Sequence, residues 1–144
     1  MNTVKYNIIP FNDTCDNSLI TPHELYIKSN NNDPRKILCN SDGSIVDFTG
    51  IINAYFTESN ETFATYSFKN GFLHSYDGNP AEISPTAKKW YFDGKLHKED
   101  GPAIVYNENY DLKAIYFLHG IAYSLKEYLK RIPEKNAILL SLQV

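Results

Sequence analysis

The chain has 144 residues, of which 42% are hydrophobic and 22% are charged, and its formal net charge is −3. This size and apolar content suit one domain with one core, and the absence of a long basic run leaves nonspecific nucleic-acid binding with little electrostatic support. No apolar run approaches the roughly 18 residues that a membrane span needs, and no signal peptide follows Met1. We therefore expect residues 1–144 to form a single soluble domain in the cytoplasm that binds neither nucleic acid nor membrane.

Residues 1–60 begin with a predicted strand, Val4–Ile9, and the proline that follows excludes it from the centre of a sheet. Thr21 and Pro22 fit the start of a helix, but the same stretch fits a strand at 24–28, which we favour. Residues 29–34 have the composition of a loop. Further strands are predicted at 35–39, 44–48 and 51–57, with an Asp42-Gly43 hairpin turn between the first two. This part is either an N-terminal β region of diverged repeats or a distinct cap.

A repeated segment dominates residues 61–122. Trp90–Ala103 reads WYFDGKLHKEDGPA, Tyr66–Ala81 is a degenerate copy, and a third, shorter copy covers 116–120. The equivalent residues are each 23 positions apart: Gly71 and Gly94, His74 and His97, and Asp77 and Asp100. Such a fixed period is typical of stacked repeats.

The repeat predicts a mainly β fold. Asn70-Gly71 and Asp93-Gly94 are strong hairpin signals, because both pairs tolerate the positive φ of tight turns. Strands are predicted around these turns at 63–69, 81–83, 88–92, 103–106 and 112–118. Consecutive hairpins of this kind indicate an antiparallel β-hairpin repeat meander.

Residues 123–144 are predicted to be a short C-terminal helical cap. Ser124 and Glu127 form a capping box before a helix that ends near Ile132, and Pro133 suits the first turn of a second helix at 134–142. The apolar residues 138, 139, 140 and 142 would cover the last repeat, which otherwise exposes an apolar face and a sheet edge.

The repeat pattern, Trp-Tyr-x-(Asn/Asp)-Gly-Lys-x-His-x-x-Asp-Gly-Pro-Ala, resembles one found in proteins of T-even-type bacteriophages and large DNA viruses. It is also similar to the MORN-variant repeats of some bacterial immunity and antitoxin-like proteins. The resemblance covers about residues 63–131. It implies a MORN-like architecture and a viral or mobile-element origin, but no reaction.

His74 with Asp77, and His97 with Asp100, are the candidates for chemistry. A His–carboxylate pair can act as a general base or proton relay, which would make the chain an enzyme. Alternatively, each imidazole bonds a neighbouring turn and each aspartate caps its own turn. Because a catalytic site is usually single whereas a scaffold motif recurs, we favour the structural role and expect no enzymatic activity.

Metal and disulfide chemistry have weak support. Stacked repeats could bring the two histidines together as ligands, but no compact ligand motif is present, so we expect no metal and no cofactor. Cys15 and Cys39 have no spacing partners, and two reduced thiols are expected, although whether they pair is left open.

Aromatic residues and nearby lysines point instead to binding, because Tyr and Trp dominate interface hot spots. Alternation along the strand places Trp90 on one side of the sheet and Tyr91 on the other. A lysine beside such rings could also grip a nucleotide. The candidate binding residues are Trp90, Tyr91, His97, Asp100, His74, Tyr66 and Lys95.

Three functions follow from these residues and the resemblance. The first is a non-enzymatic protein-interaction module, which the resemblance makes a viral or phage accessory protein that inhibits a host defence protein, or an immunity or antitoxin protein that binds a cognate partner. The second is a small-ligand protein that holds or sequesters a nucleotide signal. The third is an enzyme that uses His97 and Asp100. Exposed sheet edges also allow a homo-oligomer.

Overall fold

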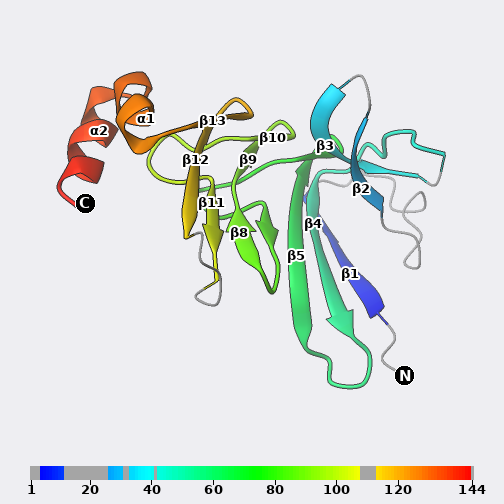
Figure 1. Ribbon diagram of the computed structural model, residues 1–144. Coiled ribbons are helices and arrows are strands. Elements are labelled where there is room, and N and C mark those ends of the chain that lie inside the picture. Colours follow the sequence, from blue (N-terminus) through cyan, green and yellow to red (C-terminus); the bar gives the residue numbers. More distant parts are fainter. Residues whose placement is uncertain (1–3, 12–25, 31–32, 41, 108–112, 144) are drawn as a thin grey trace.

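The computed structural model describes residues 4–11, 26–30, 33–40, 42–107 and 113–143 (Figure 1). The protein is mainly antiparallel β, with two short helices at its C-terminal end. The strands are β1 (Val4–Pro10), β2 (Tyr26–Asn30), β3 (Asp33–Cys39), β4 (Gly50–Phe56), β5 (Thr62–Lys69), β6 (Phe72–Leu73), β7 (Glu82–Ile83), β8 (Ala87–Lys89), β9 (Tyr91–Phe92), β10 (Lys95–Leu96), β11 (Ile104–Tyr106), β12 (Ala114–Leu118) and β13 (Ile121–Tyr123).

The main sheet is open and branches at β5. Its strand order is β13-β12-β11-β8-β7-β5-β6-β3-β2, while β4 pairs with β5 and carries β1 (Figure 1). Phe68 and Lys69 of β5 pair with β6, and Thr65 and Tyr66 pair with β7. Because β6 then pairs with β3 rather than with a consecutive strand, the sheet departs there from the simple meander that the sequence predicts.

The main core lies where the N-terminal strands meet the repeats. Phe48, Ile52, Phe68 and Leu73 are fully buried in one cluster, and Tyr91 joins it. The rings of Phe48 and Phe68 meet edge to face, with centroids 6.1 Å apart. Aromatic pairs in this geometry add to the stability gained by apolar burial. The described strands of the N-terminal part therefore share their core with the repeats.

Two helices close the other end of the sheet, as predicted (Figure 1). They are α1 (Leu125–Arg131) and α2 (Glu134–Ser141), and Ser124 caps α1 by accepting from the Glu127 amide at 3.3 Å. A second core cluster joins Leu118 to Tyr128, Ile132 and Leu140.

Of the four apolar residues expected to cover the sheet, only Leu140 is buried. Ile138, Leu139 and Leu142 are 55%, 51% and 79% exposed, because α2 turns a single residue of this run into the cluster. Pro133 is the N-cap of α2 rather than a residue of its first turn. In the described part of the chain, no helix is long and apolar enough to cross a membrane.

The hairpin of β2 and β3 corrects the loop predicted at 29–34. Ser29 and Asn30 belong to β2, and Asp33 and Pro34 belong to β3, with an irregular register after Ser29. Proline is tolerated in β3 because the β6 pairing on its other edge involves only Ile37. Of the helix-or-strand alternative at 21–28, residues 21–25 lie outside the described residues, and the strand β2 covers the rest.

Two further strand predictions need correction, and one strand was not predicted. Residues 44–48 form only an isolated bridge, Cys39 to Ile45, because the Leu38 amide bonds the Gly71 carbonyl instead. The predicted strand 88–92 is broken at Trp90: its amide bonds the Ala103 carbonyl and extends the β8–β11 pairing, while its carbonyl accepts from the His97 amide at the base of the β9–β10 hairpin. Strand β13 is not predicted by the sequence pattern; its pairing with β12 completes a hairpin after Gly120.

Candidate functional site

Three hairpin turns of the structure share one backbone arrangement. Each has a residue with positive φ followed by a glycine, and the glycine amide donates to a carbonyl of the preceding unit at 2.7–2.8 Å. We call each of these turns, with its partners in the preceding unit, a rung. The three turns are Asn70-Gly71, Asp93-Gly94 and His119-Gly120, and the accepting carbonyls belong to Phe48, Leu73 and Leu96.

A side chain from the preceding unit accepts the other amide of each turn. In the first rung it is the Thr49 hydroxyl, at 2.9 Å. In the second, His74 Nδ1 accepts from the Asp93 amide at 3.1 Å, and in the third, His97 Nδ1 accepts from the His119 amide at 3.0 Å. Since a ring nitrogen must be unprotonated to accept, this geometry assigns both imidazoles the neutral form with hydrogen on Nε2. The two histidines thus have the turn-bonding role expected of a scaffold motif.

The surroundings of both histidines favour that neutral form. Burial lowers the pKa of His74, although the Asp93 carboxylate 3.3 Å from Nδ1 opposes the shift. Burial also lowers the pKa of His97, with a further contribution from His119, while Glu99 at 3.5 Å from Nε2 opposes it. The acids beside the imidazoles are therefore Asp93 and Glu99, and not the aspartates three residues after each histidine.

Aromatic side chains continue from the rungs in an unbroken row that is exposed at Phe11, Phe92 and His119 and buried at His74. Phe92 lies between the two histidines and is 51% exposed, and Phe11 at one end is 48% exposed. We call this set the ring row. It runs in the order Phe11, Tyr76, His74, Phe92, His97 and His119, with successive centroids 5.2, 5.0, 5.0, 5.8 and 4.3 Å apart.

A pocket of about 270 Å³ adjoins the end of the ring row. His119 belongs to both features, and Ile121 beside it is 57% exposed. Two lysines, Lys36 of β3 and Lys95 of β10, also line the pocket, which we call the turn pocket. The other lining residues are Tyr91, Gly94, Leu96 and Gly120.

The remaining predicted site residues divide between this surface and the interior. Trp90 is half-buried, and its Nε1 donates to the Gly78 carbonyl at 2.9 Å. The Lys98 ammonium lies 3.9 Å from the centre of its ring, and burial lowers the pKa of that lysine. Asp100 is exposed and Lys95 is exposed at the turn pocket.

Tyr66 and Tyr91 belong to the packing around the main core. Tyr91 is 4% exposed, and Tyr66 is half-buried against the cluster. Burial raises the pKa of both phenols, and the Glu82 carboxylate raises them further. Glu82 pairs with Lys89 at 3.3 Å, so the charge beside the two phenols is compensated. Tyr66 is therefore an interior residue, whereas Tyr91 reaches the turn pocket.

Four residues of the ring row were not predicted as site residues: Phe11, Tyr76, Phe92 and His119. Phe92 had a usable signal, because alternation from the buried Tyr91 places it on the outer face. His119 occupies the same position before glycine as Asp93, so the third copy of the repeat also pointed to it. Phe11 and Tyr76 had no such signal, since their contact joins segments 65 residues apart.

No group of three potential metal ligands from His, Cys, Asp and Glu occurs among the residues that the structure describes. Cys39 is buried, and Cys15 lies outside the described residues. A scan against protein-family models and searches of curated proteins and solved structures found no match to this chain.

Proposed function

We propose that this chain is a protein-interaction module that binds its partner through the ring row and the turn pocket. The exposure of Phe92 carries the proposal: a large apolar ring is 51% exposed at the centre of a continuous aromatic row. Exposed apolar groups of this kind mark interaction sites, and aromatic residues supply most interface hot spots. Phe11 and Ile121 extend the apolar surface toward either end.

The turn pocket supports a particular chemistry for the partner. Leu96 and Ile121 give it apolar walls, while Lys36 and Lys95 bring two ammonium groups beside them. In the part of the chain that the structure describes, neither lysine has an ion-pair partner. A partner segment with an apolar side chain next to a carboxylate would match both features, since complementary charge fixes the register of a complex.

The bonding of the repeat histidines favours binding over His/Asp catalysis. Each Nδ1 is engaged by a backbone amide, so only Nε2 could exchange a proton with a substrate. In His97 that atom is 3.5 Å from the Glu99 carboxylate. The imidazoles therefore hold the rungs in place, and the rings that they support form the recognition surface.

The recurring rungs support a MORN-like repeat architecture, and the resemblance of the repeat bears on the class of partner. Because similar repeats occur in viral and phage proteins, we propose a host defence protein as the partner. This chain would inhibit that protein by occupying its surface. For an immunity or antitoxin protein, the cognate toxin takes that place.

Quantitative affinity capture with the full chain tests the proposal. Phe92→Ala should lose the captured protein, because truncation of a central hot spot costs about 2 kcal/mol or more, roughly a thirtyfold weaker Kd. Ile138→Ala is the matched control, since Ile138 on α2 is similarly exposed at 55% but lies outside the site. Retention of the same partner by both variants would contradict the proposal.

Charge reversal tests the pocket separately. Lys36→Glu with Lys95→Glu should weaken the purified complex, whereas Lys126→Glu on the exposed face of α1 should not. Binding of a nucleotide at the turn pocket, with no protein captured, would support the small-ligand alternative instead.

A further inference from the structure

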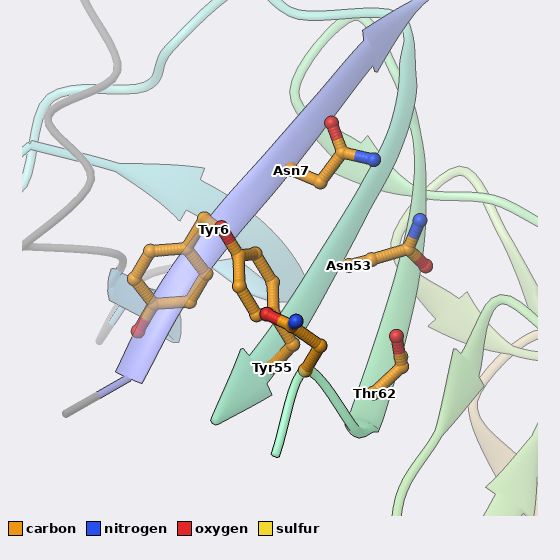
Figure 2. A pocket seen from close by; sticks show the side chains of 6 residues that line it. Tyr6, Asn7, Asn53, Tyr55 and Thr62 are labelled. Carbon is orange, nitrogen blue, oxygen red and sulfur yellow. The ribbon is translucent and has the colours of Figure 1, made fainter. Parts of the chain in front are cut away.

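A second pocket lies on β1, β4 and the turn that follows β4 (Figure 2). Figure 1 shows β1 and β4 on the side of the molecule away from the helices. Asn7 of β1 pairs with Asn53 of β4, and Asn53 pairs with Thr65 of β5, so these three side chains share one face of the sheet. Tyr55 lies two residues beyond Asn53 on the same face. The pocket has a volume of about 320 Å³.

The wall of this pocket is polar and uncharged. It is lined by Tyr6, Asn7, Asn53, Tyr55, Asn60 and Thr62. Figure 2 shows the polar groups of Asn7, Asn53 and Thr62 on the same side of β1 as the ring of Tyr55, while the ring of Tyr6 points away from them. Amides and hydroxyls both donate and accept hydrogen bonds. A ligand that complements such a wall must therefore also carry groups that do both. The size is at the lower end of the range for small-molecule sites, about 300–1,000 Å³.

Two features hold the wall in place without occupying it. The Thr65 hydroxyl donates to Asn53 Oδ1 at 2.8 Å, which fixes that amide and leaves its NH₂ group available. At the end of the β4–β5 hairpin, Phe56 and Phe63 stack with centroids 4.5 Å apart. The backbone N–H of Asn60 donates to the Phe56 carbonyl at 2.9 Å, which holds the turn beside that stack without using the Asn60 side chain.

The remaining polar groups are open to a ligand. Among the residues that the structure describes, the side chains of Asn7, Tyr55, Asn60 and Thr62 have no hydrogen-bond partner. The wall has no charged side chain in the described part of the chain, and Lys5, which pairs with Tyr55, is not among the lining residues. Lys5 shares this face of the sheet beside Tyr55, but the lining itself offers an anion no counter-charge, whereas a neutral ligand needs none.

We propose that this pocket binds a neutral polyhydroxylated molecule of one or two sugar rings. The hydroxyl groups of the sugar bond the amides of Asn7, Asn53 and Asn60, and its C–H face packs on the ring of Tyr55. The site is independent of the ring row, so either proposal can fail without the other.

Titration of the ¹⁵N-labelled full chain with glucose, galactose, mannose, N-acetylglucosamine and maltose tests this site. At least one sugar should shift the amide resonances of the pocket residues saturably, with a Kd in the millimolar range. Asn7→Ala should weaken that binding about three- to tenfold, the loss of one hydrogen bond. Asn7 is exposed and lacks a partner in the described part of the chain, so the variant should fold.

Asn79→Ala is the control, since Asn79 is an exposed asparagine in a distant turn and its loss should leave the Kd unchanged. Glucose 6-phosphate provides a second comparison and should bind no tighter than glucose. The proposal is overturned if no sugar of the panel shifts the pocket resonances, if Asn7→Ala and Asn79→Ala behave alike, or if the phosphate binds more tightly.

Discussion

The first and third rungs have the same backbone but very different surroundings. Gly71 and Gly120 both have φ +83°. A Cβ added at Gly71 would lie 2.3 Å from the Val46 carbonyl oxygen, whereas at Gly120 its nearest neighbour would be the Lys95 side chain at 3.8 Å. The first rung is packed against Ile45 and Val46, which lie in the connection between β3 and β4, and the third is open.

The side chains that complete the rungs do not follow this division. Thr49 completes the first rung, and His74 completes the second, which is also packed, since a Cβ added at Gly94 would lie 2.7 Å from Arg35 Cβ. His97 completes the open third rung, so one backbone requirement is met by a hydroxyl in one rung and by imidazoles in the other two. The imidazoles combine two roles: Nδ1 accepts from the next turn, and the rings pack against Phe92 and His119.

The largest expected loss of stability is at Gly71, and it should exceed the loss at Gly120. Gly120→Ala should lose about 1–2 kcal/mol of stability, the strain of a left-handed residue with a Cβ. Gly71→Ala should lose about 1–3 kcal/mol more, because the methyl group also collides with backbone. Chemical denaturation of both variants measures the difference, and equal losses would contradict the packed-versus-open comparison.

Removal of a rung imidazole should have the next largest effect. His74 is only 8% exposed, and His74→Ala leaves the Asp93 amide without its acceptor, at a cost of about 1–3 kcal/mol. His119→Asn changes an exposed ring but keeps a residue that tolerates positive φ, so stability should change by less than about 0.5 kcal/mol. Urea unfolding compares the two, and a large loss for His119→Asn alone would reverse the assignment of roles.

Acidification should destabilise the two rungs that depend on His74 and His97 but not the rung that depends on Thr49. The folded pKa values of His74 and His97 lie below the ordinary 6.5, so the unfolded chain binds more protons between these values. Their contribution to stability is full above about pH 6.5 and is lost as the pH falls through the folded pKa. Hydrogen-exchange protection should therefore drop for the Asp93 and His119 amides but not for the Asn70 amide. Equal loss at all three amides would contradict this account.

The smallest effect is expected at Trp90, beyond the rungs. Lys98→Met removes the ammonium over the indole and should cost about 0.5–1 kcal/mol. The single tryptophan reports the change directly by fluorescence. Lys126→Met on α1 is the control and should leave both the emission and the stability unchanged.

The sequence predicted what depends on local chemistry. The Asn70-Gly71 and Asp93-Gly94 turns, the Ser124 cap and the turn-bonding role of the repeat histidines all follow from residue type and a fixed spacing. These features need only neighbouring residues or the next repeat, so a pattern can reveal them.

What the sequence could not predict depends on contacts between distant segments. The bond from Thr49 to the first rung was not predicted, because a threonine stands there in place of the repeat histidine. The break at Trp90 depends on backbone bonds to Ala103, just before β11, and to His97, just after β10. The exposure of Phe92 beside the buried Tyr91 follows from alternation, but its contact with both histidines depends on how the hairpins stack.

The most direct test of the scaffold role is the protonation of His74 and His97, followed by ¹⁵N NMR of the imidazole rings through a pH titration. We predict that both rings are neutral near pH 7 with hydrogen on Nε2, and that both titrate below the ordinary value of 6.5. Hydrogen on Nδ1, or titration at or above that value, would contradict the rung bonds and with them the claim that these histidines hold the turns while the surface rings serve recognition.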